Sequence, residues 1–179
     1  FLLATENSTT REIGDEPMQM RMKFNDVIIA VDENRVRGIN KLMELDKELS
    51  LVLLDDAYQH RYVKPSVSIL LTNYYKPFYD DSMMPAGMLR EPRGGYRRAD
   101  IIIVTRTPHD IVDVERKMII KKINPFPHQK VFFSSVEYQE MTPVYDVSLI
   151  DRKITKNTSV LLFTGIANAN DFRKHMEKT

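Results

Sequence analysis

The sequence predicts an α/β protein built on a parallel sheet, and three observations support this class. Four short runs are apolar almost throughout, as strands are when helices cover both faces of a sheet. Segments with helical spacing alternate with several of these runs. The 179 residues are 42% hydrophobic and 28% charged, which is typical of a globular rather than a disordered chain. The four predicted strands are 27–31, 51–55, 67–72 and 101–105.

Three segments carry the spacing of helices that pack one face against a core. Residues 16–24 and 35–45 repeat apolar residues at helical intervals. Residues 110–123 add a capping aspartate, Asp110, at the start and lysines in the last turn, where they complement the helix dipole. Strand and helix therefore alternate, as the units of a parallel sheet require.

The pattern changes near Gln129, after two closely spaced prolines. Residues 131–138 and 143–150 indicate two strands of a ribbon or hairpin, and 159–178 indicate a strand, a glycine-containing turn and a helix. We therefore expect a core domain over 1–129, and linker strands with the start of a truncated second α/β domain over 130–179.

Charge, cysteine content and hydropathy exclude several classes of protein. The 26 basic and 25 acidic residues give a net charge of +1, which argues against nucleic-acid binding through bulk electrostatics. The chain has no cysteine, which excludes disulfides, thiolate metal sites and a cysteine nucleophile. No apolar stretch approaches the roughly 18 residues that span a bilayer. The chain begins at Phe1 without a methionine, and we interpret it as a piece of a longer protein.

Two adjacent aspartates, Asp55 and Asp56, end the apolar run that starts at Leu51. A strand that ends there would place both carboxylates at the carboxyl edge of the sheet, where open α/β folds bind ligands. Magnesium is usually held by one or two carboxylates together with substrate phosphates, and two neighbouring carboxylates repel unless a cation lies nearby. This Walker B pattern predicts a magnesium-nucleotide site, with an ordinary turn entry as the alternative.

Further polar segments lack the periodicity of a core. In GDEP, 14–17, Asp15 either has a chemical role or caps the helix that starts near Pro17. The other segments are PAGMLREP at 85–92, RRAD at 97–100 and TGIANANDF at 164–172.

Taken in order, IGDEP, LLDDAYQH, PAGMLREP, RRAD and TGIANANDF resemble the motifs of tetraacyldisaccharide 4'-kinases, the lipid A kinases of Gram-negative bacteria. The resemblance runs from about Glu12 to Phe172. Ala57 stands where the family has a glycine, and Ala169 stands where it has a proline. Neither departure removes a candidate catalytic group.

This resemblance implies a P-loop-kinase-type sheet and an ATP-dependent, Mg²⁺-requiring phosphorylation. The acceptor is the 4'-hydroxyl of tetraacyldisaccharide 1-phosphate, and the product is lipid IVA, made at the cytoplasmic face of the bacterial inner membrane. ATP, the acylated glucosamine disaccharide 1-phosphate and the membrane surface are the implied partners. The alternative is a non-catalytic binding module on the same scaffold, which would tolerate replacement of Asp15, Asp55 and Asp56.

The resemblance also implies roles for individual residues. Asp15 corresponds to the catalytic base, and Asp55 and Asp56 to the Walker B pair associated with the metal. Substrate or nucleotide binding is assigned to His60, Arg90, Glu91 and Glu16. Simple packing of His60, a salt bridge of Arg90 and Glu91, and a first-turn helix role for Glu16 are the alternatives. Arg35 matches a family arginine without an assigned role.

Parts of the family pattern do not occur in the sequence. No G-x-x-x-x-G-K-[ST] is present, so the amides and lysine that hold the β and γ phosphates are missing. The family's N-terminal membrane anchor and a C-terminal histidine motif would lie outside the chain. We expect the isolated chain to be inactive, and its exposed apolar sheet surface to favour self-association.

Two surfaces leave their interpretation open. The aromatic and methionine-rich segment 72–84 suits a membrane interface or acyl chains, unless it packs on its own domain. Nucleic-acid binding would depend on a few arginines in an otherwise neutral chain. These arginines are Arg90, Arg93, Arg97 and Arg98.

Overall fold

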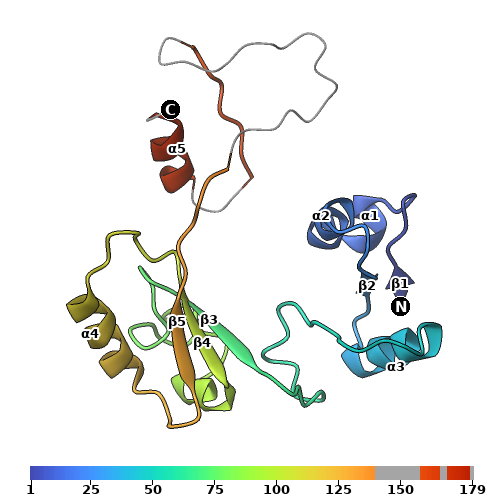
Figure 1. Cartoon of the computed structure of the whole chain (residues 1–179), viewed down its shortest axis with the longest axis horizontal. Coiled ribbons are helices and arrows are strands. Elements are labelled where there is room, and N and C mark those ends of the chain that lie inside the picture. Colours follow the sequence, from blue (N-terminus) through green and yellow to red (C-terminus); the bar gives the residue numbers. More distant parts are fainter. Residues whose placement is uncertain (140–157, 166–168, 178–179) are drawn as a thin grey trace. The chain divides into compact units, whose positions relative to one another are not determined.

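The computed structural model describes residues 1–139, 158–165 and 169–177 (Figure 1). The chain divides into two compact units, Phe1–Ser134 and Ser135–Thr179. The sequence placed a boundary near Gln129, but the division falls after the strand β5, Lys130–Phe133, because β5 belongs to the sheet of the first unit.

The centre of the first unit is a parallel sheet of three strands in the order β3-β4-β5 (Figure 1). β3 is Ile69–Asn73 and β4 is Ile101–Thr105. The parallel α/β class is therefore confirmed. The predicted ribbon is wrong in its first half: β5 joins β4 in parallel, since the intervening helix gives the crossover that parallel pairing requires. The second predicted ribbon strand, 143–150, lies outside the described residues.

One face of this sheet carries the core. Ala99, Ile102, Val104 and Ile123 form a buried cluster, and helix α4, Asp113–Ile123, lies against it (Figure 1). α4 begins later than predicted: its N-cap is Val112, not Asp110, because Val112 is still extended and makes the helix start at Asp113. Asp113 and Glu115 supply the acidic first turn instead.

The opposite face of the sheet is open in the part of the chain that the structure describes. Ile69, Leu71 and Phe132 alternate with the core residues along their strands and are 49%, 63% and 51% exposed. The expectation that helices cover both faces is met on one face only. Continuous apolar character therefore does not prove two-sided burial.

The segment before β3 holds two helices close to their predicted positions. α2 is Asp15–Lys23 and α3 is Arg35–Leu45, and a short helix, α1 (Thr10–Ile13), precedes them. The predicted strand 27–31 is reduced to β2, Ala30–Val31, which pairs antiparallel with β1, Leu2–Leu3.

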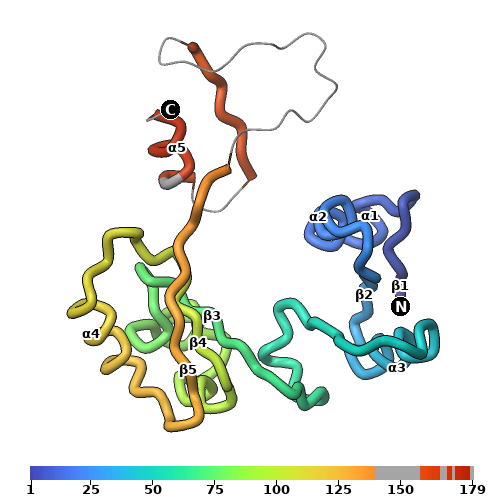
Figure 2. The backbone as a smooth tube through the Cα atoms, viewed as in Figure 1, coloured from blue at the N-terminus to red at the C-terminus, as the bar shows by residue number. Residues whose placement is uncertain are grey.

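The predicted strand 51–55 is wrong. No strand forms there, and Leu51 and Leu53 are 69% and 84% exposed. The backbone runs as an irregular segment from the end of α3 to the start of β3 (Figure 2). A strand needs a hydrogen-bonded neighbour, and none of the described strands pairs with this run. Composition alone could not reveal that.

The second unit contains α5, Asn170–Met176, which confirms the last predicted helix. The strand predicted from Ser159 does not form within 158–165, where Leu161 and Phe163 are almost fully exposed. Tyr138 stacks on His175, with ring centroids 4.2 Å apart.

A buried aspartate organises the start of α3. Asp32 accepts hydrogen bonds from Arg37 Nε at 3.0 Å and Nη2 at 2.6 Å, and its Oδ1 also accepts from the backbone of Asn34. These hydrogen bonds from Arg37 hold the pKa of Asp32 far below its usual range, against the opposing effect of burial. Gly38 lies so close that an added Cβ would be 3.1 Å from the Cβ of Asp32.

We expect Asp32→Asn to lower the melting temperature at pH 7, because a carboxylate with a depressed native pKa stabilises the fold when ionised. That contribution is complete above the unfolded-state pKa of about 3.9 and disappears as the pH falls through the native value. The melting temperatures of wild type and Asp32→Asn should therefore converge as the pH is lowered. Asp26→Asn, an exposed control, should have the melting temperature of wild type at every pH. A difference that is constant with pH would contradict the linkage.

Candidate functional site

Asp15 lies in the first turn of α2, and its side chain is exposed. Gly14, with a φ of 91°, is the N-cap, and no side chain makes a capping hydrogen bond. The capping alternative for Asp15 is therefore wrong: the helix starts at Asp15 itself, because Gly14 adopts the positive φ that turns the chain into the helix. Glu16 follows in the same turn and is also exposed.

The aspartate pair lies on an exposed turn rather than at the end of a strand. Asp55 Oδ1 accepts from the backbone N–H of Asp56 at 2.9 Å, and Asp56 has a φ of 44°. The backbone N–H of His60 donates to the backbone carbonyl of Ala57 at 2.9 Å, and this hydrogen bond closes a turn over residues 57–60. We call residues 55–60 the aspartate turn.

The aspartate turn packs beside η1, Arg93–Arg98, the 3₁₀ helix that leads into the start of β4. The sequence predicted that the pair would lie at the carboxyl edge of the sheet. That prediction is wrong, because the turn's contacts are made on the amino side of β4. With no strand at 51–55, nothing carries the pair to the opposite edge.

Arg90, from PAGMLREP, reaches the aspartate pair directly. Its Nη1 lies 3.7 Å from Asp56 Oδ2, with the two side chains 65% and 85% exposed. An exposed pair of this kind contributes little to stability. The pair matters for the arrangement of the site, because it places Arg90 of PAGMLREP beside Asp56 of LLDDAYQH.

Glu91 does not point into free solvent. Both of its carboxylate oxygens accept from Arg98 Nη2 at 2.9 Å. Arg98 also donates to the carbonyl of Tyr58 at 3.2 Å, and its guanidinium stacks over the Tyr58 ring at 4.7 Å. Arg90 and Glu91 both form salt bridges, as the structural alternative predicted, but with Asp56 and Arg98 as their partners.

The RRAD segment is the part of this site that the sequence left without a chemical role. Arg98 joins two motifs, Ala99 is fully buried in the core cluster, and Asp100 Oδ2 accepts from the backbone of Ser68 at 2.7 Å. This last bond ties the start of β3 to the start of β4. The motif was visible in the sequence, but its partners lie 7 to 40 residues away and only folding reveals them.

The aromatic and methionine-rich segment divides into two parts. Tyr74, Phe78 and Tyr79 pack against the core cluster, so the aromatic half is structural. Met83 and Met84, at its end, are 43% and 59% exposed, and Met88, just beyond the segment, is 75% exposed. Asp81 holds this second half, since Oδ1 accepts from the backbone of Ser82 at 2.7 Å and of Met88 at 3.2 Å.

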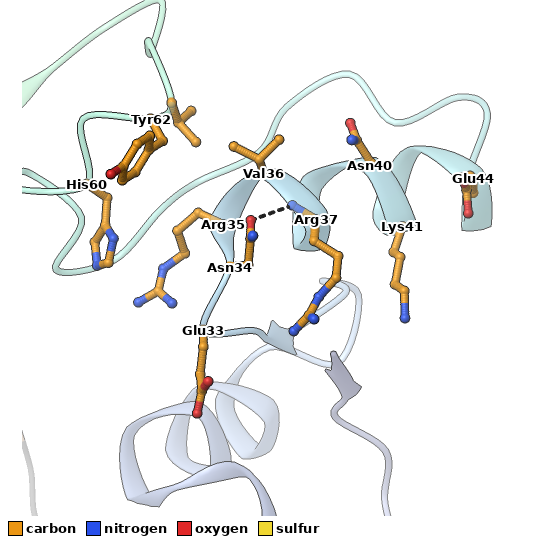
Figure 3. A pocket seen from close by; sticks show the side chains of 11 residues that line it. Glu33, Asn34, Arg35, Val36, Arg37, Asn40, Lys41, Glu44, His60 and Tyr62 are labelled. Carbon is orange, nitrogen blue, oxygen red and sulfur yellow. Dashed lines mark hydrogen bonds between the residues drawn. The ribbon is translucent and has the colours of Figure 1, made fainter.

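The end of the aspartate turn also forms one wall of an open pocket of about 840 Å³ (Figure 3). His60 and Tyr62 lie on one side, and α3, from its first turn to Glu44 in its last, forms the other. Arg35 extends from α3 on the side of the pocket where His60 lies (Figure 3), and it donates to the carbonyl of Asp32. The volume falls in the range of small-ligand sites, roughly 300–1,000 Å³.

Asp55 and Asp56 offer carboxylate oxygens of the kind that bind Mg²⁺. No group of three or more His, Asp or Glu side chains that could hold a metal occurs among the described residues. Two exposed carboxylates are nevertheless the donor set that Mg²⁺ uses when phosphates and water complete its coordination. Asp55 and Asp56 therefore fit the ion as partial ligands, not as a complete cage.

The four arginines of the nucleic-acid alternative have separate partners. Arg90 pairs with Asp56, Arg93 Nε donates to the carbonyl of Asp81, and Arg98 pairs with Glu91. Arg97 lies over the ring of Phe126 at 5.6 Å. Each of the four arginines thus contacts another residue of the protein.

These features define a parallel α/β protein in which an exposed aspartate turn is tied to an arginine-rich 3₁₀ helix. Asp55, Asp56, Arg90 and Glu91 come together, whereas the described contacts join neither Asp15 nor Glu16 to them. The chain belongs to the tetraacyldisaccharide-1-P 4'-kinase family, whose model matches residues 1–179. The family resemblance drawn from the motifs is thus confirmed.

Several curated relatives carry the name tetraacyldisaccharide 4'-kinase. The protein of Bacteroides thetaiotaomicron is 48% identical over 178 residues, which cover 94% of this chain and 47% of the relative. That of Bacteroides fragilis is 44% identical (99% and 49%), and that of Flavobacterium johnsoniae is 40% identical (99% and 52%). The chain thus spans about half the length of these relatives. Comparison with solved structures finds no match, and no helix within the described ranges has the length and apolarity to cross a membrane.

Proposed function

We propose that the full-length protein containing this chain transfers the γ-phosphate of ATP to the 4'-hydroxyl of tetraacyldisaccharide 1-phosphate. One observation carries the proposal: LLDDAYQH and PAGMLREP, the two most specific family motifs, lie together. Arg90 of one contacts Asp56 of the other, and Arg98 of RRAD bonds both to Tyr58 and to Glu91. Family membership supplies the reaction. The cytoplasmic face of the inner membrane, where the acylated acceptor would lie, is part of the same proposal.

Each group has a task in this reaction. Mg²⁺ would neutralise phosphate charge, and Asp55 and Asp56 are the residues that would hold it. Arg90 stands beside the pair and would bind phosphate oxygens once Asp56 turns to the ion. Asp15 would accept or orient the proton of the attacking hydroxyl. His60 and Arg35 would face a phosphate-bearing ligand from the pocket that they line.

The test is transfer of labelled γ-phosphate from ATP to tetraacyldisaccharide 1-phosphate by the full-length protein. Asp55→Asn and Asp56→Asn should each lower the rate by roughly 100-fold or more, the scale of losing a group that stabilises transferring charge. Asp110→Asn, an exposed carboxylate outside the motifs, should leave it unchanged. The isolated chain, which lacks a G-x-x-x-x-G-K sequence, should transfer nothing.

Two results would oppose the proposal. A folded wild-type protein that transfers no phosphate to this acceptor would remove the assigned reaction. Equal transfer by wild type and both asparagine variants would keep the reaction but remove the aspartate pair from it.

A further inference from the structure

Arg98 of RRAD connects the other two motifs of the site, because it bonds to Tyr58 of LLDDAYQH and to Glu91 of PAGMLREP. Its Nη2 contacts both oxygens of Glu91 and the carbonyl of Tyr58, while the guanidinium plane covers the Tyr58 ring. The side chains of Arg98 and Glu91 are 34% and 28% exposed, so this pair is more sheltered than that of Arg90. Sheltered, charge-assisted bonds are stronger than those in open solvent.

Tyr58 is fixed at both ends by the same helix. Its hydroxyl donates to the carbonyl of Gly95 at 2.8 Å, while its own carbonyl accepts from Arg98. The ring packs against the core cluster. Burial raises the pKa of Tyr58, so the hydroxyl stays protonated and remains a donor at neutral pH. The aspartate turn is thus anchored two residues after Asp56.

Gly95 leaves the space that this arrangement needs. A Cβ at Gly95 would lie 2.7 Å from the carboxylate carbon of Glu91. Any larger residue would therefore displace the Glu91 side chain from its place beside Arg98. A single packed unit is therefore formed by Gly95, Glu91 and Arg98.

We propose that Arg98 is a positioning residue for the aspartate pair, and that Glu91 acts by orienting Arg98 rather than by contacting substrate. Asp55 and Asp56 are exposed on a turn outside the sheet, so they depend on the Tyr58 anchor for a defined position. The guanidinium of Arg98 donates through Nη2 and stacks on the Tyr58 ring at once, whereas the ammonium of lysine has no plane that could stack. The proposal rests on the proposed kinase function for its catalytic consequence, but not for its structural one.

The experiment uses the full-length protein with Arg98→Gln, Arg98→Lys, Glu91→Gln and the double variant. Arg97→Gln is the matched control, because Arg97 precedes Arg98 in η1 and packs on Phe126 instead. The structural readout is amide hydrogen exchange in a peptide covering residues 55–60. The catalytic readout is the Mg²⁺ concentration that gives half-maximal phosphate transfer.

Exchange across the aspartate turn should be roughly tenfold faster in both Arg98 variants than in Arg97→Gln, because the anchor opens locally. The half-maximal Mg²⁺ concentration should rise by about 10- to 100-fold, the usual effect of losing an outer partner of a metal site. The effects of Glu91→Gln and Arg98→Gln on exchange and on the Mg²⁺ requirement should be non-additive in the double variant. Both substitutions remove the same Arg98–Glu91 pair. Melting curves identify variants that fail to fold, and Arg98→Lys then replaces Arg98→Gln in the comparison.

Exchange at 55–60 that is the same in Arg98 and Arg97 variants would overturn the proposal. Additive losses for Glu91→Gln and Arg98→Gln would also overturn it, because they would place Glu91 in a separate role such as substrate contact. If wild type transfers no phosphate, the proposed kinase function fails, yet the exchange comparison still decides whether Arg98 holds the turn.

Discussion

Replacing Asp15 by alanine in the full-length protein is expected to lower kcat for phosphate transfer by roughly 10²- to 10⁴-fold, the contribution of a positioned proton acceptor. The structural reason is that Asp15 is exposed and makes no capping hydrogen bond to α2. A chemical role is therefore not masked by a structural one. KM for ATP should change little, because the loss falls on the chemical step.

Melting temperature separates this interpretation from a helix effect. An acid in the first turn of a helix contributes only about 0.3–1 kcal/mol through the dipole. Asp15→Ala should therefore melt close to wild type, and Asp26→Ala, an exposed acid outside any helix, should retain full activity. Equal transfer by Asp15→Ala and wild type would reduce Asp15 to a first-turn acid.

Ile102→Ala is expected to destabilise the first unit by about 2–5 kcal/mol, the range for deleting a fully buried branched side chain. Ile102 is fully buried in the central strand β4, where it packs with Val104 and Ile123. Its neighbours Val104 and Ile123 come from β4 and α4, and packed surroundings of this kind relax only in part, so a cavity remains. Denaturant unfolding of the full-length protein measures the change.

Val114→Ala on α4 is the control, because Val114 is 69% exposed. It should change the free energy of unfolding by no more than about 0.5 kcal/mol. If Ile102→Ala lowers the free energy of unfolding as little as Val114→Ala does, the buried cluster around Ile102 is not the core of this unit.

The parallel sheet was predictable in part from local pattern. The segment 101–105 became β4 and 35–45 became α3 with the predicted bounds, since the first is apolar almost throughout and the second has helical spacing. The run 51–55 has equally strong apolar character but forms no strand. Strand formation depends on a partner, and the presence of a partner is not written in the run itself.

The site shows the same division. Asp15, Asp55, Asp56, Arg90 and Glu91 were identified from motifs, but the motifs could not show that Glu91 is paired with Arg98 or that Asp15 leaves its helix uncapped. Tyr58 and Arg98 belong to the family motifs, but the motifs assign neither of them a role in the kinase site. Their significance lies in contacts across 37 and 40 residues of chain.

The sequence by itself determined the family and the α/β class, and it named the charged residues of the candidate site, because spacing and side-chain type are local properties. Only the tertiary structure decided beside which end of β4 the aspartate turn packs and which arginine contacts it there. Those outcomes follow from pairing and packing between distant segments. Backbone partners and shared buried space, which no single stretch of sequence contains, set them.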